Sequence, residues 1–387
     1  MTLAAPGRVA AARALLGVEE GGHAEELLGQ FAPPAGPDRA QAWFLALGVL
    51  RRRSEVDAAL RPLLSAPLGG LDPGVRATLR LGAYERLAAR TPVHAAVSQA
   101  VEVARALGWG RASGLVNAVI RKVEPASHLS RAEALCAPTW LVHRWDARYG
   151  PEATEAWCRK NLETAAIFAV SRDPREPLRR VPDGAGRVTE LPGFREGEWW
   201  VADPGAVAVA DLVPANGTVL DACAAPGGKA FRLASRGAEV FAVDRAADRL
   251  ALVAEGATRL RLPVPIRRHD WREGGIDRIF DAVLVDAPCT GIGTIRRHPE
   301  IKWRRALPDL AEVSALQREI LGRAARCVRP GGVLVYAVCS PEPEEGSEVI
   351  RTFRAENPEF AIDAVIGDAL PEGDADAHWA VRLVREG

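Results

Sequence analysis

From residue 212 onward, short runs rich in β-branched residues alternate with stretches rich in Ala and Arg. Five such runs are candidate strands, at residues 218–222, 239–243, 264–269, 280–285 and 332–338. Strands that alternate with helices in this way are typical of right-handed βαβ units, in which helices cover both faces of a mostly parallel sheet. The sequence therefore predicts an α/β domain. Ligands of such domains bind beyond the carboxyl ends of the strands.

The length predicts more than one domain, because 387 residues exceed what one compact core usually organises. Residues 1–37 begin Ala-rich and end in a Pro- and Gly-rich cluster, which predicts a helix and a linker. Residues 38–128 place apolar side chains at helical spacing, which predicts an all-α domain. Residues 129–203 are expected to form a small α/β connector, and residues 204–387 the α/β domain.

Five tryptophans fall in the connector: Trp140, Trp145, Trp157, Trp199 and Trp200. Tryptophan rings in a nucleic-acid-binding protein can stack on unpaired bases. They can equally well anchor a core or a domain interface, because each buries a large apolar surface. Of the two interpretations we favour the packing role.

The composition favours a well-packed cytoplasmic protein, with 48% hydrophobic and 26% charged residues. No apolar run approaches the roughly 20 residues that a membrane helix needs, and the first 40 residues lack the pattern of a secretory signal. The formal net charge of zero leaves room for a local positive face that could meet nucleic acid. We therefore expect no contact with a membrane.

The cysteines are too irregularly spaced for a disulfide framework or a zinc site, which would show close CxxC or CxxH pairs. We predict free thiols and no bound metal. The six positions are Cys136, Cys158, Cys223, Cys289, Cys327 and Cys339.

The first candidate strand runs into a glycine-rich turn that opens a helix. A phosphate-binding P-loop would need Gly in place of Cys223 and Ser or Thr in place of Ala230. A dinucleotide fingerprint would need three glycines in GxGxxG spacing, which this turn lacks. What remains is a turn whose backbone can approach a flat ligand that is uncharged or cationic. Its residues are Cys223, Ala224, Ala225, Pro226, Gly227, Gly228 and Lys229.

Four carboxylates stand at or just after strand ends: Asp221, Asp244, Asp270 and Asp286. An acidic side chain at the end of the second strand can accept both hydroxyl groups of a ribose. Together with a loop that lacks a phosphate clamp, the set suits an adenosine that carries a sulfonium, as in S-adenosylmethionine. Solvated strand-end aspartates are the alternative at any single position.

Cys339 follows the fifth strand on the ligand side of the sheet, opposite the loop that begins at Asp286. A cysteine beside a buried strand is usually a small hydrophobic residue. Here its position favours a nucleophile that adds to carbon 6 of cytosine and thereby activates carbon 5. Asp286 is the candidate for a hydrogen bond to the ring N3, and Cys289, or a water near it, for the elimination step. The target base must be unpaired or flipped out.

Three motifs of the α/β domain closely resemble the RsmB (Sun/Fmu) 16S rRNA cytosine-5 methyltransferases of the NOL1/NOP2/Sun family. They are Asp221 to Lys229, Asp286 to Trp303, and Tyr336 to Ser340. The helical region resembles NusB, an RNA-binding protein, at residues 79–84, 94–97 and 116–121. The resemblance implies a Rossmann-like class I methyltransferase domain with a seven-stranded sheet behind an all-α, NusB-like, RNA-binding domain.

The resemblance also implies roles for the residues of the motifs. Cys339 is the nucleophile and Cys289 assists product release. The substrate is one cytosine of 16S rRNA, free or in an early assembly intermediate, and the enzyme is expected to act as a monomer. The implied contacts with S-adenosylmethionine come from residues 223–229, Asp244, Asp270 and Asp286.

Four positions depart from the family's pattern: Val338 and Ala230 stand in place of threonine, Gly346 in place of Asn, and Ala202 in place of Gln. Two alternatives therefore stay open. The same chemistry could act on tRNA or 23S rRNA, or the helical domain could bind RNA beside a vestigial methyltransferase domain. A vestigial site would be expected to lose Cys339 or the glycine loop, and the sequence retains both.

Overall fold

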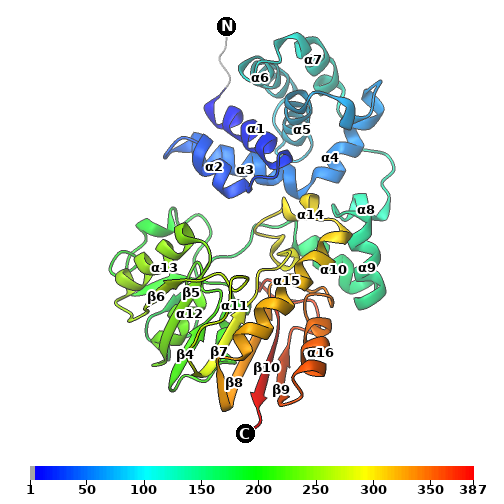
Figure 1. The fold of residues 1–387 in the computed structure, drawn as a ribbon. Helices are drawn as coiled ribbons and strands as arrows, with labels where there is room; N and C mark the ends of the chain where they lie inside the picture. Colours follow the sequence, from blue (N-terminus) through cyan, green and yellow to red (C-terminus); the bar gives the residue numbers. More distant parts are fainter. Residues whose placement is uncertain (1–4) are drawn as a thin grey trace. The chain divides into compact units, whose positions relative to one another are not determined.

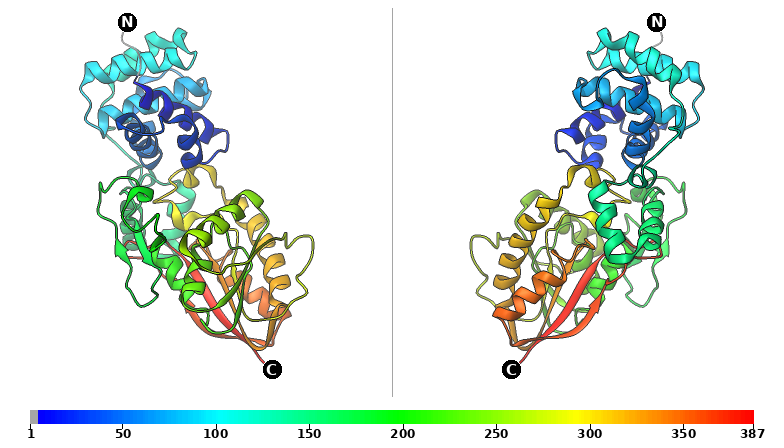
Figure 2. Two further views of the ribbon diagram at one scale, coloured as in Figure 1. Left: turned by 90° about the vertical axis from the view of Figure 1, so that its left-hand side faces the viewer. Right: turned by 90° about the vertical axis from the view of Figure 1, so that its right-hand side faces the viewer.

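The structure is a computed structural model that describes residues 5–387. The chain divides into two compact units. One, the helical unit, comprises Met1–Thr164 together with Ile295–Arg305. The other, the sheet unit, comprises Ala165–Thr294 and Ala306–Gly387. Figure 1 labels the helices and the strands of the large sheet, and Figure 2 gives two side views.

The helical unit contains an apolar core built by the first seven α-helices of the chain, with Trp303 packed against it. Prolines stand at the first positions of four helices of this unit, where the missing N–H costs nothing. Its helices are α1 (Pro6–Glu19), α2 (Ala24–Phe31), α3 (Pro37–Arg51), α4 (Arg53–Leu60), α5 (Pro73–Leu87), α6 (Val93–Ala106), α7 (Ser113–Lys122), α8 (Arg131–Ala134), α9 (Thr139–Tyr149), α10 (Pro151–Lys160) and α14 (Ile301–Arg304).

The sheet unit contains the expected mostly parallel seven-stranded sheet, in which the last two strands run antiparallel to their neighbours. Its strand order is β6 (Ile266–Arg268), β5 (Glu239–Asp244), β4 (Thr218–Asp221), β7 (Phe280–Asp286), β8 (Val328–Val338), β10 (Trp379–Arg385) and β9 (Phe360–Ile366). A small antiparallel sheet has the order β2 (Arg179–Arg180), β1 (Phe168–Ser171) and β3 (Trp199–Val201). The five candidate strands are all present, with ends shifted by up to four residues.

Helices cover both faces of the large sheet, because successive side chains of its strands point to opposite sides. Val219 packs in the core beneath α11 (Pro204–Asp211), α12 (Gly228–Ser235) and α13 (Ala247–Leu260). Its neighbour Leu220 packs beneath α15 (Leu307–Ala325) and α16 (Ser347–Glu356). The sheet is therefore buried on both sides, which leaves its carboxyl edge as the place for a ligand.

The division into units differs from the four segments expected from the sequence. Helices α1 and α2 were expected to precede the all-α domain, but Leu15 and Leu28 belong to the same core as Leu45 and Leu79. The expected connector does not form one body, since α8, α9 and α10 belong to the helical unit and β1, β2 and β3 to the sheet unit. The Pro- and Gly-rich cluster that suggested a linker lies between two helices of a single core.

Most of the connector's tryptophans pack, as we favoured. Trp145, Trp157, Trp199 and Trp200 are each less than 5% exposed. Trp140 is half-buried. No helix within residues 5–387 has both the length and the apolar character needed to cross a bilayer.

Residues 295–305 leave the sheet unit after β7 and pack into the helical unit. Glu300 is fully buried and accepts a hydrogen bond of 3.2 Å from the backbone N–H of Ala24. The indole N–H of Trp303 donates to the carbonyl of Leu50 at 2.6 Å. The ammonium of Lys302 donates to the carbonyls of Arg51 at 2.9 Å and Cys136 at 2.6 Å. This segment, most of which lies within one of the family motifs, is therefore an anchor in the helical unit.

The anchor predicts an unusual titration for Lys302. Burial lowers the pKa of its ammonium to about 8, against an ordinary value of about 10.4. The unfolded chain binds more protons than the folded chain between these values, so this group makes the protein more stable as the pH rises from about 8 to 10. The chain has only four lysines, so selective 13C-lysine labelling should show one Cε signal that titrates near pH 8.

The Lys302→Arg variant assigns that signal, because it should disappear while the other three remain. Lys229 provides an internal contrast, since its pKa is raised. Four lysine signals that all titrate at pH 10 or above would contradict the buried position of Lys302.

Candidate active site

The glycine-rich turn lies between β4 and α12, as expected. Gly227 has φ of 112°, a left-handed conformation that favours glycine. A Cβ there would lie 2.4 Å from the ring of Phe231, so a side chain is excluded. A Cβ at Gly228 would meet nothing within 4 Å. The turn therefore presents bare backbone to open space at the N-terminus of α12.

Asp244 and Asp270 have different environments at the carboxyl edge of the sheet. Asp244 ends β5 and accepts hydrogen bonds from the backbone N–H groups of Ala225 at 3.1 Å and Ala246 at 2.9 Å. It therefore belongs to the glycine-rich turn. Asp270 lies beyond β6 and is held by Arg272, whose guanidinium lowers the pKa of that carboxyl. Any ligand contact of Asp270 has to share the carboxylate with this ion pair.

Asp221 is the carboxylate with the most unusual environment. It ends β4 and is 1% exposed, and neither of its oxygens has a hydrogen-bond partner in the described chain. Burial and the charge of Asp286 raise its pKa to about 7. A buried carboxylate without a partner is costly. A cationic group of a ligand bound at this edge would relieve that cost.

Lys229 and Asp286 form an ion pair of 2.7 Å between Nζ and Oδ2. Burial alone would lower the pKa of Lys229, but the Asp286 carboxylate outweighs it and raises the pKa overall. The lysine is therefore a firmly held ammonium. Asp286 was expected to donate a hydrogen bond if it were protonated, and in this arrangement the nearest proton is on Lys229.

The two candidate catalytic cysteines lie in contact. The Sγ atoms of Cys289 and Cys339 are 3.1 Å apart, and both residues are partly exposed free thiols. The hydrogen bond to Cys339, followed by burial, raises the pKa of Cys289 well above its ordinary value. The raised pKa favours the protonated thiol at Cys289.

A buried glutamate that the sequence analysis did not select connects the two cysteine loops. Glu345 is fully buried. Its carboxylate accepts a hydrogen bond of 2.7 Å from the backbone N–H of Thr290, next to Cys289, and one of 2.6 Å from the Thr290 hydroxyl. It also accepts one of 2.5 Å from the hydroxyl of Ser340, next to Cys339, and one of 3.2 Å from the amide of Gln317. Glu345 therefore fixes both loops at once.

Gly293 adds a second connection between the same loops. Its N–H donates to the carbonyl of Cys339 at 2.9 Å, and its carbonyl accepts from the N–H of Ala377 at 3.0 Å. A Cβ at this position would lie 2.0 Å from the Ala377 carbonyl oxygen. The close approach of three backbone segments thus requires glycine. No motif in the sequence around Ala377 had indicated this contact.

Three of the four departures from the family pattern have a physical explanation. Val338 and Ala230 are fully buried in the apolar cores on the two faces of the sheet, where an apolar side chain packs without an unpaired hydroxyl. Gly346 lies against Trp379, whose ring is 2.9 Å from the position of a Cβ, so a larger residue would displace it. Ala202 packs at the edge of an apolar core, and nothing in the structure explains the absence of Gln there.

With this geometry in view, comparisons with known proteins identify the family. Residues 209–370 match the family model of the 16S rRNA methyltransferase RsmB/F, and residues 6–125 match the NusB family. Ribosomal RNA small subunit methyltransferase B of Thermus thermophilus is 40% identical, with 92% of this chain and 89% of the relative covered. The enzyme of the same name from Cronobacter sakazakii is 34% identical, with 86% of each covered. The chain belongs to the RsmB/F family of rRNA methyltransferases.

Solved structures agree with the fold. PH0851 matches with a TM-score of 0.80 over 100% of both chains, at 22% identity. NSun6 from Pyrococcus horikoshii, solved with SFG, matches with a TM-score of 0.55 at 17% identity, over 65% of this chain and 98% of the other. The NusB match begins at residue 6 and so includes α1 and α2, in agreement with their place in the helical core.

The methyl donor of this rRNA methyltransferase is S-adenosylmethionine. The residues present fit it. The unpartnered Asp221 carboxylate suits a cationic group, and the open backbone at Gly228 suits a flat one. Asp244 keeps further lone pairs for ribose hydroxyl groups beside its two backbone hydrogen bonds.

The position of Glu345 predicts a large effect from a small change. In Glu345→Gln, one carboxylate oxygen becomes an NH2 group that donates and cannot accept, so at least one hydrogen bond from Thr290 or Ser340 has to break or reverse its direction. A buried group left without its partner costs about 1–3 kcal/mol. We expect the single-turnover methylation rate to fall about 5- to 150-fold, the factors that correspond to about 1–3 kcal/mol.

The affinity for S-adenosylmethionine should stay unchanged in that variant, because Glu345 makes no hydrogen bond to the glycine-rich turn. Glu356→Gln, an exposed glutamate on α16, is the matched control and should behave as wild type. Equal loss of rate and of cofactor affinity would show that Glu345 supports the whole domain and not the cysteine pair.

Proposed function

We propose that this enzyme transfers a methyl group to carbon 5 of a cytosine in 16S rRNA through a covalent bond between Cys339 and carbon 6. The observation that carries the proposal is the pair of sulfurs, Cys289 and Cys339, whose Sγ atoms lie 3.1 Å apart. Two cysteines in contact beside a cofactor turn have no evident use in methyl transfer to a nitrogen or a hydroxyl oxygen. They suit a reaction that makes and breaks a carbon–sulfur bond.

The chemistry requires the covalent bond because carbon 5 of cytosine is a poor nucleophile. Addition of the Cys339 thiolate to carbon 6 breaks the 5,6 double bond and places its electron pair where carbon 5 can attack. S-adenosylmethionine supplies the electrophilic methyl group. The ammonium of Lys229, whose pKa is raised in part by Cys339, contributes positive charge beside the thiolate.

Lys229 and Asp286 lie together where the ring is expected to bind. Negative charge builds at N3 as the thiolate adds. An Asp286 carboxyl group that carries a proton donates a hydrogen bond to N3, which is the role expected of it from the sequence. Lys229, 2.7 Å from Asp286, keeps its own proton and adds positive charge beside the ring. Both groups are on hand in the resting site, so no large rearrangement is needed.

Cys289 acts at the end of the cycle. Once carbon 5 carries the methyl group, its proton must leave and the bond to Cys339 must break. Because Cys289 is held as a thiol, we assign the proton to a water beside it. The S–H of Cys289 then stabilises the departing Cys339 thiolate through the contact that the two sulfurs already make.

Two substitutions separate these roles. Cys339→Ala should form no adduct with RNA and no product, because the nucleophile is gone. Cys289→Ala should accumulate a covalent protein–RNA adduct, because the leaving thiolate loses its hydrogen-bond donor. Denaturing gel electrophoresis with labelled RNA and S-adenosylmethionine measures both. Normal turnover by Cys289→Ala would refute the release role.

The target is tested by incubating unmodified 16S rRNA, free or in early assembly intermediates, with labelled S-adenosylmethionine. Bisulfite sequencing should reveal 5-methylcytosine at a single position. Competition with purified tRNA and 23S rRNA should leave that transfer in place. Preferred methylation of a competitor would reassign the substrate, and absence of methylation on every RNA would favour the vestigial interpretation. The proposal places the enzyme in the cytoplasm and treats it as a monomer.

A further inference from the structure

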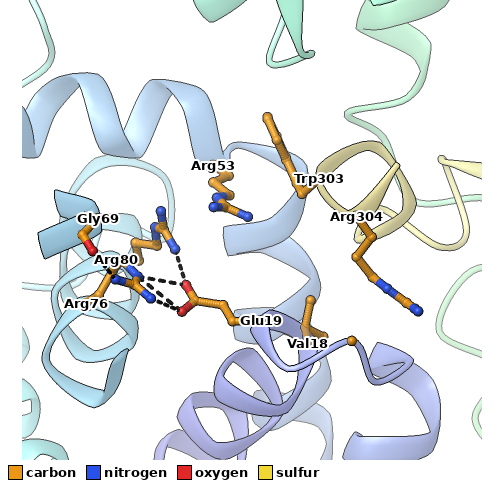
Figure 3. Close-up of a pocket in the computed structure, with 9 residues that line it drawn as sticks. Val18, Glu19, Arg53, Gly69, Arg76, Arg80, Trp303 and Arg304 are labelled. Carbon is orange, nitrogen blue, oxygen red and sulfur yellow. Dashed lines mark hydrogen bonds and ion pairs between the residues drawn. The ribbon is translucent and has the colours of Figure 1, made fainter. Parts of the chain in front are cut away.

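An arginine-rich pocket of the helical unit is held together by its own ion pairs. It has a volume of about 620 Å³ and is lined by Arg53, Arg76, Arg80 and Arg304 around Glu19. Figure 3 shows Arg76 and Arg80 bonded to Glu19, while the guanidinium of Arg304 points away from Arg53. The four guanidiniums therefore do not converge on one ligand. A side chain that the reaction above leaves unused lies instead at the carboxyl edge of the large sheet.

This side chain is His378, which lies beside the candidate nucleophile. β10 pairs antiparallel with β8, and His378 and Cys339 lie just beyond the last pair of their ladder. The neighbouring N–H of Ala377 donates to the carbonyl of Gly293, whose own N–H donates to the carbonyl of Cys339. Two sets of backbone contacts thus hold His378 next to the cysteine.

The imidazole of His378 points to the face of the sheet that carries the glycine-rich turn. Ala380, two residues further on, packs in the core beneath α11, α12 and α13, and side chains two positions apart in a strand share a face. The same alternation along β8 places Cys339 on that face. Asp286 is there too, because it forms an ion pair with Lys229 of α12. The imidazole therefore shares one side of the edge with both groups that are expected to contact the target ring.

Asp203 fixes the ring of His378 in one orientation. Its carboxylate caps α11 by accepting from the N–H of Gly205 at 2.8 Å, and it also accepts from the N–H of Asp376 at 3.1 Å. The Nδ1 atom of His378 lies 3.3 Å from the carbonyl oxygen of Asp376 and 3.7 Å from Oδ1 of Asp203. Both neighbours are acceptors, so the tautomer that satisfies them carries its proton on Nδ1 and its lone pair on Nε2.

The imidazole is neutral at neutral pH. Burial, followed by the positive charge of Lys229, lowers the pKa of His378, and these two effects outweigh the opposite effects of Asp203 and Asp286. The side chain is only 7% exposed. Its Nε2 atom has no hydrogen-bond partner among the described residues. His378 therefore presents an acceptor, and no donor, from Nε2.

The proposed reaction places two opposite atoms of the target ring, carbon 6 at Cys339 and N3 at Asp286. Two orientations of the ring meet this condition. One directs the amino group on carbon 4 toward His378, and the other directs the carbonyl oxygen on carbon 2 toward it. A carbonyl oxygen requires a donor, whereas an amino group donates to a lone pair such as that of Nε2. The first orientation therefore matches the chemistry of the histidine.

We propose that Nε2 of His378 accepts a hydrogen bond from the amino group of the target cytosine and thereby selects cytosine against uracil. Uracil carries an oxygen at carbon 4, so it would bring a second acceptor against Nε2. A site built to accept from an amino group discriminates against a base that lacks it, because the buried acceptor is left unpaired. The inference rests on the proposed function, which supplies the positions of carbon 6 and N3.

The test compares His378→Phe with the wild type on two RNAs. One carries cytosine at the position that bisulfite sequencing identifies, and the other carries 2-pyrimidinone there, which is cytosine without the amino group. Phenylalanine keeps a flat ring and removes the acceptor. The matched control is His128→Phe, because His128 is exposed in the helical unit. The readout is kcat/KM for transfer of labelled methyl, and the ratio between the two RNAs cancels their difference in intrinsic reactivity.

His378→Phe should lower kcat/KM on the cytosine RNA at least about fivefold, the factor for the smallest usual cost of an unpaired buried donor. On the 2-pyrimidinone RNA it should match the wild type, and the control should match it on both. The preference for cytosine over uracil at the target should shrink by a similar factor. If His378→Phe does not melt cooperatively, His378→Leu takes its place in the same comparison.

Two results would overturn the inference alone. An equal loss on the cytosine and 2-pyrimidinone RNAs would assign His378 to stacking or packing, and an unchanged rate on both would show that it makes no contact with the base. Failure of the proposed function gives a different pattern, because the wild type itself would then place no methyl group on carbon 5 of cytosine. That result would refute both the function and this inference.

Discussion

The parallel pairing of β7 and β8 is the constraint on which the candidate site depends. The ladder places Asp286 beside Ala337, so the loops that carry Cys289 and Cys339 leave the sheet from neighbouring strands at the same edge. Strand pairing alone would leave the two loops free to move apart. The Glu345 carboxylate accepts hydrogen bonds from Thr290 and Ser340. Gly293 makes backbone hydrogen bonds to both Cys339 and Ala377. The contact between the two sulfurs is therefore a product of backbone and buried polar interactions around it.

The electrostatics of the site are centred on Lys229, a cation among several acids. Lys229 forms an ion pair with Asp286, and the charge of Asp221 also raises its pKa. Asp221 is 1% exposed, and burial, followed by the charge of Asp286, raises its pKa to about 7, so its protonation equilibrium lies near neutral pH. A bound cation would shift that balance toward the carboxylate. Cofactor binding and the charge on Asp221 are coupled by this arrangement.

The sequence was sufficient for the features that depend on local order. Strand positions follow from β-branched runs, and residues at strand ends gather at one edge of a parallel sheet. Asp221, Lys229, Asp286, Cys289 and Cys339 could therefore be grouped in advance. The ion pair between Lys229 and Asp286 could not be predicted, because it depends on the geometry of two side chains that are 57 positions apart in the sequence.

Features that depend on contacts between residues far apart in the sequence could not be predicted in the same way. Glu345 sits in a run of acidic residues that resembles a solvated surface, and only the fold shows that it is fully buried between two loops. The boundary after residue 37 was placed by a Pro- and Gly-rich cluster, but core packing, and not turn composition, decides which helices form a unit. Arg53 and Arg304 are 251 positions apart and share a pocket only because residues 295–305 pack into the helical unit.

Residues 295–305 also connect the Cys289 loop of the sheet unit directly to the helical unit. Only five residues separate Cys289 from Ile295, where the anchor begins. Among those five residues, Thr290 donates a hydrogen bond to Glu345, and Gly293 donates one to the carbonyl of Cys339. At the other end, Lys302 and Trp303 are fixed to carbonyl groups of the helical unit. The covalent connection therefore joins the hydrogen-bonded cysteine loop of the sheet unit to the anchored segment of the helical unit over five residues.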